Sequence, residues 1–298
     1  MVYILNVMPY CKNSHYRYWL IGNSKLKLFF LYLLIVLIAG CAPVKPRPEN
    51  GESALTNSTA IQKATDFLKD LGLAAMAQGN YAKAIADFTR AVKINPKDPI
   101  VWKYLGEAYM AAKFYPQAEK AFNKALSLKP DYGEVMFDLG LLYEQWGKYD
   151  EAIKWLKKAA YLPTYEERYL AFYELAQVYK KLGDEQNYLK NLNIAVNLYP
   201  RFKKALLELA DYYAKQGNVD KAYLYYAQYL SYYPTDWNIA LKFARFLIEH
   251  NRFSEAKALL KEIVNQSQDP QVVQKAYKLI NELLIKEAQM KFKNKNNK

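Results

Sequence analysis

Apolar and polar positions follow a helical period between Pro99 and Tyr132. Trp102, Leu105 and Tyr109 recur at spacings of three and four residues, which places them on one face of a helix. A second run has the same spacing and ends before a proline, which cannot donate the next backbone hydrogen bond. This run contains Ala118, Phe122 and Ala125, and the proline is Pro130. The pattern predicts two amphipathic helices that pack against each other as a pair.

The same pattern recurs at intervals of about 34 residues, as a pair that cannot bury its apolar face alone requires. The recurring positions are Leu71, Leu105 and Leu139, then Gly72, Gly106 and Gly140, then Ala84, Ala118 and Ala152, then Ala91, Ala125 and Ala159. This set resembles the tetratricopeptide repeat (TPR) family. The resemblance implies an all-α fold, an α-solenoid coiled into a right-handed superhelix of about six TPR helix pairs with a C-terminal capping helix.

The repeat positions divide the second part of the chain. We expect six repeats at 65–98, 99–132, 133–166, 169–202, 203–236 and 237–270, with a two-residue slip of register between the third and fourth. An apolar stripe over 271–290 predicts a capping helix with one polar face, because a solenoid end needs such an element. The basic tail, 291–298, is predicted to be disordered.

The N-terminal part has a different pattern. Residues 28–40 form a wholly apolar run behind two lysines, too short to span a bilayer comfortably as a helix and typical of a signal-peptide core. The run leads into the sequence IAGC at 38–41, which resembles the bacterial lipobox. That resemblance implies cleavage after residue 40, a diacylglyceryl thioether on Cys41 and acylation of the new amino group. We therefore expect 1–40 to be a signal peptide.

The segments before and after this apolar run predict where translation starts and how the protein is tethered. The first 24 residues show neither a helical period nor turn signals, so we expect an over-extended start at Met1 and true initiation near Leu26. Residues 41–64 are rich in Pro, Ser, Thr and Asn and predict a flexible lipidated tether of roughly 25 Å. Ala42 follows the cysteine, which by the sorting rule of enteric bacteria favours the outer membrane. The expected location is the bacterial cell envelope, as a lipoprotein facing the periplasm.

Composition narrows the function classes. The net charge of +13 favours acidic surfaces, but no basic stripe with interleaved aromatic residues predicts a nucleic-acid partner. Two Cys and two His cannot build a zinc site without carboxylates, and no hydrolase, phosphate-loop or zinc-protease motif is present. We therefore expect no enzyme, no metal, no cofactor and no small-molecule substrate. The 28 tyrosines predict packing between helices, with a sugar- or peptide-stacking surface as the alternative.

Stacked helix pairs present a concave surface lined by the first helix of each pair. Family geometry places repeat positions 2, 5, 9 and 12 on that surface. The candidate protein-binding groove contains Leu73, Met76, Ile100, Lys103, Glu107, Phe137, Leu141, Leu170, Tyr173, Leu207 and Asp211, and the same positions include Leu241 and Ile248. A mixed apolar and charged lining suits an amphipathic helix or an extended peptide from a partner protein. The alternative for each residue is packing against the neighbouring repeat.

The resemblance extends to a narrower group. A lipobox, about six repeats and the segment KKAAYLPTYEERYLAFYELAQVY at 157–179 are similar to the pilotin lipoproteins of type IV pilus systems, the PilF/PilW group. This likeness implies a non-enzymatic outer-membrane lipoprotein that helps to deliver or assemble the secretin ring, with an apolar secretin segment held by the first three repeats. Two alternatives remain: a periplasmic adaptor for cell-wall hydrolases or envelope-assembly factors, and a polysaccharide-export component.

Overall fold

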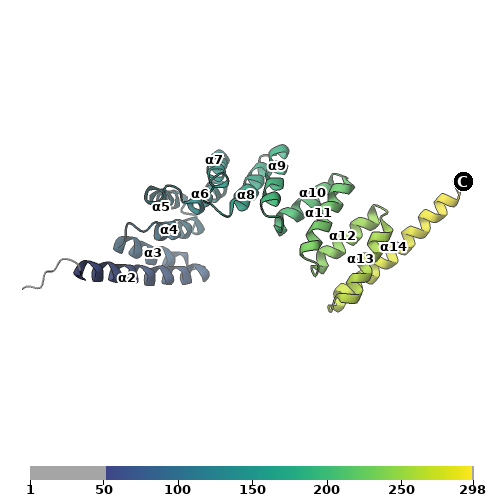
Figure 1. The fold of residues 1–298 in the computed structure, drawn as a ribbon, viewed down its shortest axis with the longest axis horizontal. Coiled ribbons are helices and arrows are strands. Elements are labelled where there is room, and N and C mark those ends of the chain that lie inside the picture. The colour runs from purple at the N-terminus through teal and green to yellow at the C-terminus, as the bar shows by residue number, and fades with distance from the viewer. Residues whose placement is uncertain (1–51, 297–298) are drawn as a thin grey trace, which may run out of the picture. The chain divides into compact units, whose positions relative to one another are not determined.

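The computed structural model describes residues 52–296. Within that range every regular element is an α-helix, which confirms the predicted all-α fold. Figure 1 labels the helices in chain order. Their bounds are α2 Glu52–Ala77, α3 Tyr81–Ile94, α4 Pro99–Ala111, α5 Tyr115–Leu128, α6 Gly133–Gln145, α7 Tyr149–Ala160, α8 Arg168–Lys181, α9 Glu185–Leu198, α10 Lys203–Lys215, α11 Val219–Tyr232, α12 Trp237–Glu249, α13 Phe253–Gln266 and α14 Pro270–Asn296.

The chain divides into a short unit that ends at Ala60 and a larger unit that begins at Ile61. In the larger unit the helices pack as pairs, and each pair also contacts the next one along the chain. Its apolar side chains form three buried clusters in chain order, and some partly buried side chains pack against two neighbouring clusters. Trp102 packs against both the first and the second cluster, and Tyr213 against both the second and the third. Neighbouring pairs therefore cover each other's apolar faces.

Small residues allow the two helices of a pair to approach closely. Phe88 and Phe122 are fully buried, and each ring lies directly over a glycine of the preceding helix. A Cβ atom on Gly106 would lie only 2.5 Å from Cε1 of Phe122, and one on Gly72 only 2.4 Å from Cε1 of Phe88. The glycines that the sequence pattern singled out thus occupy contact points between paired helices.

One backbone conformation recurs in the loop that joins the two helices of each pair. Gly79, Gly147, Gly183 and Gly217 have positive φ there, and so do Lys113 and Asn251. A residue in the left-handed conformation ends a helix, because the amides that follow can then bond to the last carbonyls of the helix. Glycine adopts this conformation without the steric penalty of a Cβ atom. Lys113, with φ 62°, therefore carries strain that the four glycines avoid.

Lys113→Gly should stabilise the protein. Glycine removes the Cβ penalty at this left-handed residue, so the free energy of unfolding should rise by about 0.5–1 kcal/mol in urea titrations. The matched control is Lys113→Ala, which deletes the same long side chain and keeps the Cβ. An equal gain from the alanine variant would show that the side chain, not the backbone, limits stability at this position.

Helix α2 is longer than the repeat pattern predicted. It begins at Glu52, so residues 52–64, which we expected to belong to a flexible tether, are helical. No proline or glycine interrupts the chain between Glu52 and Leu71, which lets the helix extend toward the N-terminus. The signal peptide, Cys41 and the rest of the tether lie outside the described residues.

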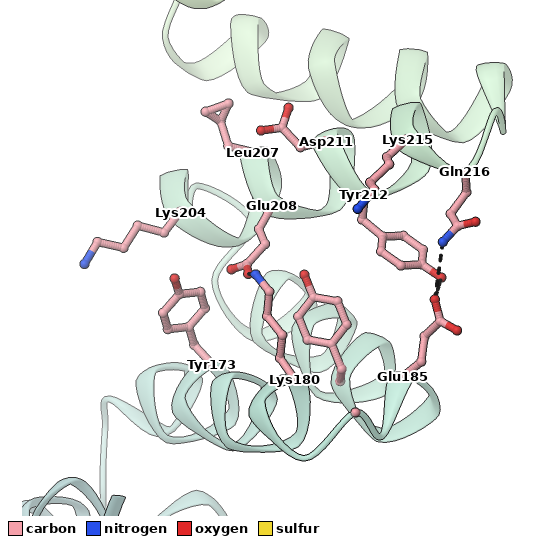
Figure 2. Close-up of a pocket in the computed structure, with 12 residues that line it drawn as sticks. Tyr173, Lys180, Glu185, Lys204, Leu207, Glu208, Asp211, Tyr212, Lys215 and Gln216 are labelled. Atoms are coloured by element: carbon pink, nitrogen blue, oxygen red, sulfur yellow. Dashed lines mark hydrogen bonds and ion pairs between the residues drawn. The ribbon is translucent and has the colours of Figure 1, made fainter. Parts of the chain in front are cut away.

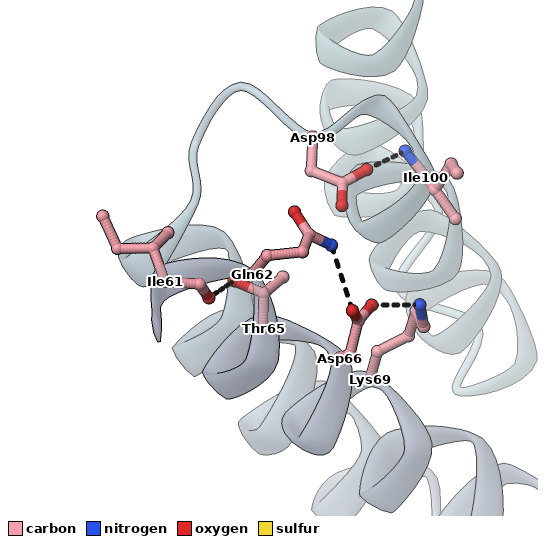
Figure 3. Close-up of polar contacts among 7 residues, drawn as sticks. All are labelled: Ile61, Gln62, Thr65, Asp66, Lys69, Asp98 and Ile100. Carbon is pink, nitrogen blue, oxygen red and sulfur yellow. Dashed lines mark hydrogen bonds and ion pairs between the residues drawn. The ribbon is translucent and has the colours of Figure 1, made fainter. Parts of the chain in front are cut away.

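Local polar contacts support this extension of α2 (Figure 3). Thr65 is fully buried, and its hydroxyl donates to the carbonyl oxygen of Ile61 at 2.8 Å. The next residue, Asp66, accepts from Gln62 at 3.2 Å and pairs with Lys69 at 2.5 Å. Each bond joins residues three or four apart, the spacing at which side chains and carbonyls of one helix meet.

The C-terminal helix also exceeds its predicted bounds. We expected a capping helix over 271–290 and disorder beyond it, but α14 runs from Pro270 to Asn296. The prediction of disorder is wrong for 291–296, because the basic tail contains no proline or glycine to end the helix. Lys291 instead pairs with Glu287 one turn earlier, at 2.9 Å.

Candidate protein-binding site

The residues predicted to line a groove lie on the first helix of successive pairs. They are Leu73 and Met76 on α2, Ile100, Lys103 and Glu107 on α4, Phe137 and Leu141 on α6, Leu170 and Tyr173 on α8, and Leu207 and Asp211 on α10. Ile100 is exposed and the others are half-buried. Leu241 and Ile248 on α12 were expected on the same surface, but they are only 8% and 5% exposed. For these two, the alternative of packing inside the solenoid is the correct one.

A cavity of about 830 Å³ lies where α8, α9 and α10 meet (Figure 2). It is lined by Tyr173, Lys180, Gly183, Glu185, Tyr188, Lys204, Leu207, Glu208, Asp211, Tyr212, Lys215 and Gln216. Three of the predicted groove residues therefore share one cavity, namely Tyr173, Leu207 and Asp211. The other eight do not line it. A hollow of this size admits several side chains of a bound peptide.

Helix α10 supplies a charged row along the cavity. Lys204, Glu208, Asp211 and Lys215 follow at intervals of four, three and four residues, so they share one face of the helix. Leu207 is half-buried beside them. Figure 2 shows Lys204 at one end of the row and Glu208 and Asp211 between it and Lys215. The helical period thus presents two carboxylates flanked by two lysines.

Each carboxylate of the cavity already has partners. Glu208 accepts from the amide of Gln177 at 2.9 Å and pairs with the ammonium of Lys180 at 2.5 Å. Glu185 accepts from the hydroxyl of Tyr212 and from the amide of Gln216. The hydrogen bond to Glu185, and then burial, raise the pKa of Tyr212 to about 12, so this hydroxyl stays protonated at neutral pH.

Asp211 has one partner in its own repeat and one in the next. The hydroxyl of Tyr226 donates to Asp211 Oδ1 at 2.6 Å, and the ammonium of Lys242 reaches Asp211 Oδ2 at 2.7 Å. Its carboxylate therefore joins α10 to α11 and α12. This member of the predicted groove is committed to contacts within the protein.

A second polar cluster lies between α4 and α6. Lys103 and Glu107 form an ion pair at 2.7 Å on α4, and Asp138 of α6 faces them. Asp138 Oδ2 is shielded from solvent and has no hydrogen-bond partner. Burial, and then the charge of Glu107, raise the pKa of Asp138 far above the usual carboxyl range. Lys103 and Glu107, both predicted groove residues, therefore lie beside a buried carboxyl group that the repeat pattern did not predict.

Comparison with protein-family models identifies the family to which these helix pairs belong. Two models, both described as tetratricopeptide repeat, match the chain, one at residues 69–130, 105–167 and 173–238 and the other at 213–280. The first model alone covers more than half of the sequence. The chain belongs to the tetratricopeptide repeat family. The TPR assignment agrees with the repeat pattern and with the paired helices.

Solved structures of other TPR proteins resemble it. PilF of Pseudomonas aeruginosa is 20% identical, with a TM-score of 0.56 over 72% of this chain and 97% of PilF. PilW, described as a widely conserved type IV pilus biogenesis factor, is 24% identical, with a TM-score of 0.51 over 70% of this chain and 97% of PilW. These identities establish a shared fold. A comparison with curated protein sequences gives no match.

The TPR pattern did not point to the cavity, but one residue could have. Tyr188 stands at the repeat position that is alanine in five other repeats, as Ala84, Ala118, Ala152, Ala222 and Ala256. A large side chain at a helix contact point holds neighbouring helices apart or fills a gap between them. Tyr188 does line the cavity, and its ring meets that of Tyr212 edge-on at 6.0 Å.

Within residues 52–296, no group of three or more His, Cys, Asp or Glu side chains could hold a metal ion. In the same range no helix is long and apolar enough to cross a membrane.

Proposed function

We propose that this TPR protein is a membrane-anchored, non-enzymatic scaffold that holds a segment of a partner protein against the first helices of its repeats. The partner would be a subunit of the type IV pilus secretin, and the scaffold would assist its assembly or its targeting to the outer membrane. The observation that carries the proposal is the structural similarity to PilF and PilW, which spans most of this chain and nearly all of theirs.

Two features of the chain support it. Cys41, in its lipobox-like sequence, would carry the acyl chains, and several chains together give stable membrane anchoring. The cavity of α8, α9 and α10 offers a concave surface with apolar and charged side chains, the combination that peptide recognition uses. The eight groove residues outside that cavity, from Leu73 to Leu170, would extend the contact along the earlier repeats.

Deletion of the gene tests the role in secretin assembly. Secretin rings should disappear from outer-membrane fractions and monomers should accumulate, as measured by semi-denaturing gels and immunoblotting. A wild-type copy should restore the rings, and a copy with Cys41→Ala should not, because it lacks the lipid anchor. Cys11→Ala is the matched control and should restore them. Normal rings in the deletion strain would exclude this role and favour the periplasmic adaptor.

A further inference from the structure

The charged row of α10 ends in two lysines that the protein itself leaves unpaired. Among the described residues, neither Lys204 nor Lys215 forms an ion pair or a side-chain hydrogen bond, and both are exposed. The other cation of the cavity, Lys180, is bound to Glu208. The free positive charges of the cavity therefore lie at the two ends of the row.

The middle of the row is electrically balanced. The ammonium of Lys180 offsets Glu208 at 2.5 Å, and the ammonium of Lys242 offsets Asp211 at 2.6 Å. Opposite charges at such distances cancel most of each other's field beyond the pair. An incoming anionic group would consequently meet little repulsion from these two carboxylates and attraction from Lys204 and Lys215.

One further acid that interacts with Lys204 does little to satisfy its charge. Glu174 of α8 lies close enough for the ammonium to act on it, but burial, and then the charge of Glu144, raise the pKa of Glu174 to about 7. A carboxyl that titrates near neutral pH is only partly charged there, so it competes weakly for the lysine. Lys204 remains available to a ligand.

Beside the paired carboxylates Glu208 and Asp211, the cavity also has aromatic and aliphatic lining residues. Tyr173 of α8 lies across the cavity from Leu207 of α10 (Figure 2), and Tyr188 of α9 also lines it. Burial raises the pKa of both tyrosines above the usual range, so their rings stay uncharged. This part of the cavity suits an apolar side chain better than a charged one.

The spacing sets the length of the ligand. Lys204 and Lys215 are eleven residues apart on one helix, which at 1.5 Å per residue is about 16 Å along the axis. An extended peptide advances roughly 3.3 Å per residue, so about five residues span that distance. We infer that the cavity of α8, α9 and α10 binds an acidic segment of the partner protein, with carboxylates about five residues apart on Lys204 and Lys215 and an apolar side chain between them. This inference rests on the proposed protein-binding function and specifies its chemistry.

Fluorescence anisotropy with synthetic peptides tests it. The probe is a labelled octapeptide with Glu at its second and seventh positions, Leu at its fourth and Gly or Ser elsewhere. It should bind at least tenfold more tightly than the same peptide with Gln or Lys in place of both Glu, and the difference should shrink as salt is raised. Equal binding of the Glu and Gln peptides, or absence of binding by all three, would overturn the inference.

Charge reversal on the protein locates the site. The double variant K204E/K215E should bind the Glu peptide at least tenfold more weakly and should favour the Lys peptide. The matched control K190E/K261E changes the net charge equally at exposed lysines outside the cavity and should bind like the wild type. Equal losses in both double variants would show that only overall charge matters and would overturn the assignment. All these lysines are exposed, and circular dichroism should report unchanged helix content.

The peptide-binding experiment and the deletion experiment can fail independently of each other. Binding of the Glu peptide at Lys204 and Lys215, together with normal secretin rings in the deletion strain, would keep the acidic-segment site and exclude the pilus partner. Loss of rings on deletion, together with equal binding of the Glu and Gln peptides, would keep the pilus role and exclude the acidic segment at this cavity.

Discussion

Gly106→Ala should lower the free energy of unfolding by about 2–3 kcal/mol. The added methyl would lie 2.5 Å from Cε1 and 2.6 Å from Cδ1 of Phe122, a separation that forces one of the two helices to move. The ring cannot turn away, because Phe122 is fully buried among the side chains of the second cluster. Overpacking of a rigid core usually costs 1–3 kcal/mol, which exceeds alanine's gain in helix propensity. Urea unfolding followed by circular dichroism measures the change.

The chain itself contains the matched rescue for this variant. In the fourth repeat the equivalent positions are Ala176 and Leu192, and in the sixth they are Ala244 and Leu260. These two repeats therefore combine an alanine with a leucine, which is smaller than the phenylalanine ring, whereas the fifth repeat combines Ala210 with Tyr226. The double variant Gly106→Ala with Phe122→Leu should be more stable than the sum of its two single changes predicts. Strict additivity of the two losses would contradict the proposed contact.

The same glycine shows why much of the fold could be predicted. Helix pairing depends on local spacing, and the recurrence of Leu105, Gly106 and Ala118 every 34 residues or so identifies both the contact point and its period. Prolines such as Pro130 mark where a helix cannot continue. The first helices of the pairs, and hence the helices that carry the candidate groove, follow from those signals.

The two ends of the helical region could not be predicted from the repeat pattern. Residues 52–64 and 291–296 carry no repeat signature, and composition alone suggested flexible segments. Each continues a packed helix, however, and extension adds one hydrogen bond per residue without a new nucleation step. Composition describes a segment in isolation, whereas the adjoining helix decides its structure.

The cavity could not be predicted because it depends on contacts between repeats. Lys180 and Gln177 of the preceding repeat bind the carboxylate of Glu208. Lys242 of the following repeat pairs with Asp211. Repeat numbering places each residue on a surface but does not show these partners. The absence of ion-pair partners for Lys204 and Lys215 among the described residues likewise emerges only from the structure.

Asp138→Asn should stabilise the protein above neutral pH and leave its stability at acid pH nearly unchanged. Burial, and then the charge of Glu107, raise the pKa of Asp138 from 3.8 to about 8, against the opposing charge of Lys103. The folded protein therefore holds a proton that the unfolded chain releases. A carboxyl with a raised pKa contributes its stability below the unfolded value, and that contribution is lost as pH rises from about 4 to about 8.

The asparagine removes this loss, because it never has to ionise in the buried site. Its side-chain amide can also donate a hydrogen bond, which an ionised carboxylate cannot. The gain should grow across that pH range and reach the order of 2 kcal/mol at its upper end, since each unit of pKa shift is worth about 1.4 kcal/mol and relaxation reduces the total.

Urea titrations at several pH values measure the profile of Asp138→Asn. The control is Asp131→Asn, an exposed residue nearby with the same change of charge, and its stability difference from the wild type should stay within about 0.5 kcal/mol at every pH. A constant gain for Asp138→Asn would mean that a packing effect, not a buried proton, is responsible. A loss that deepens with pH would show that the ionised Asp138 is stabilised by Lys103, the reverse of the electrostatic balance inferred from its burial beside Glu107.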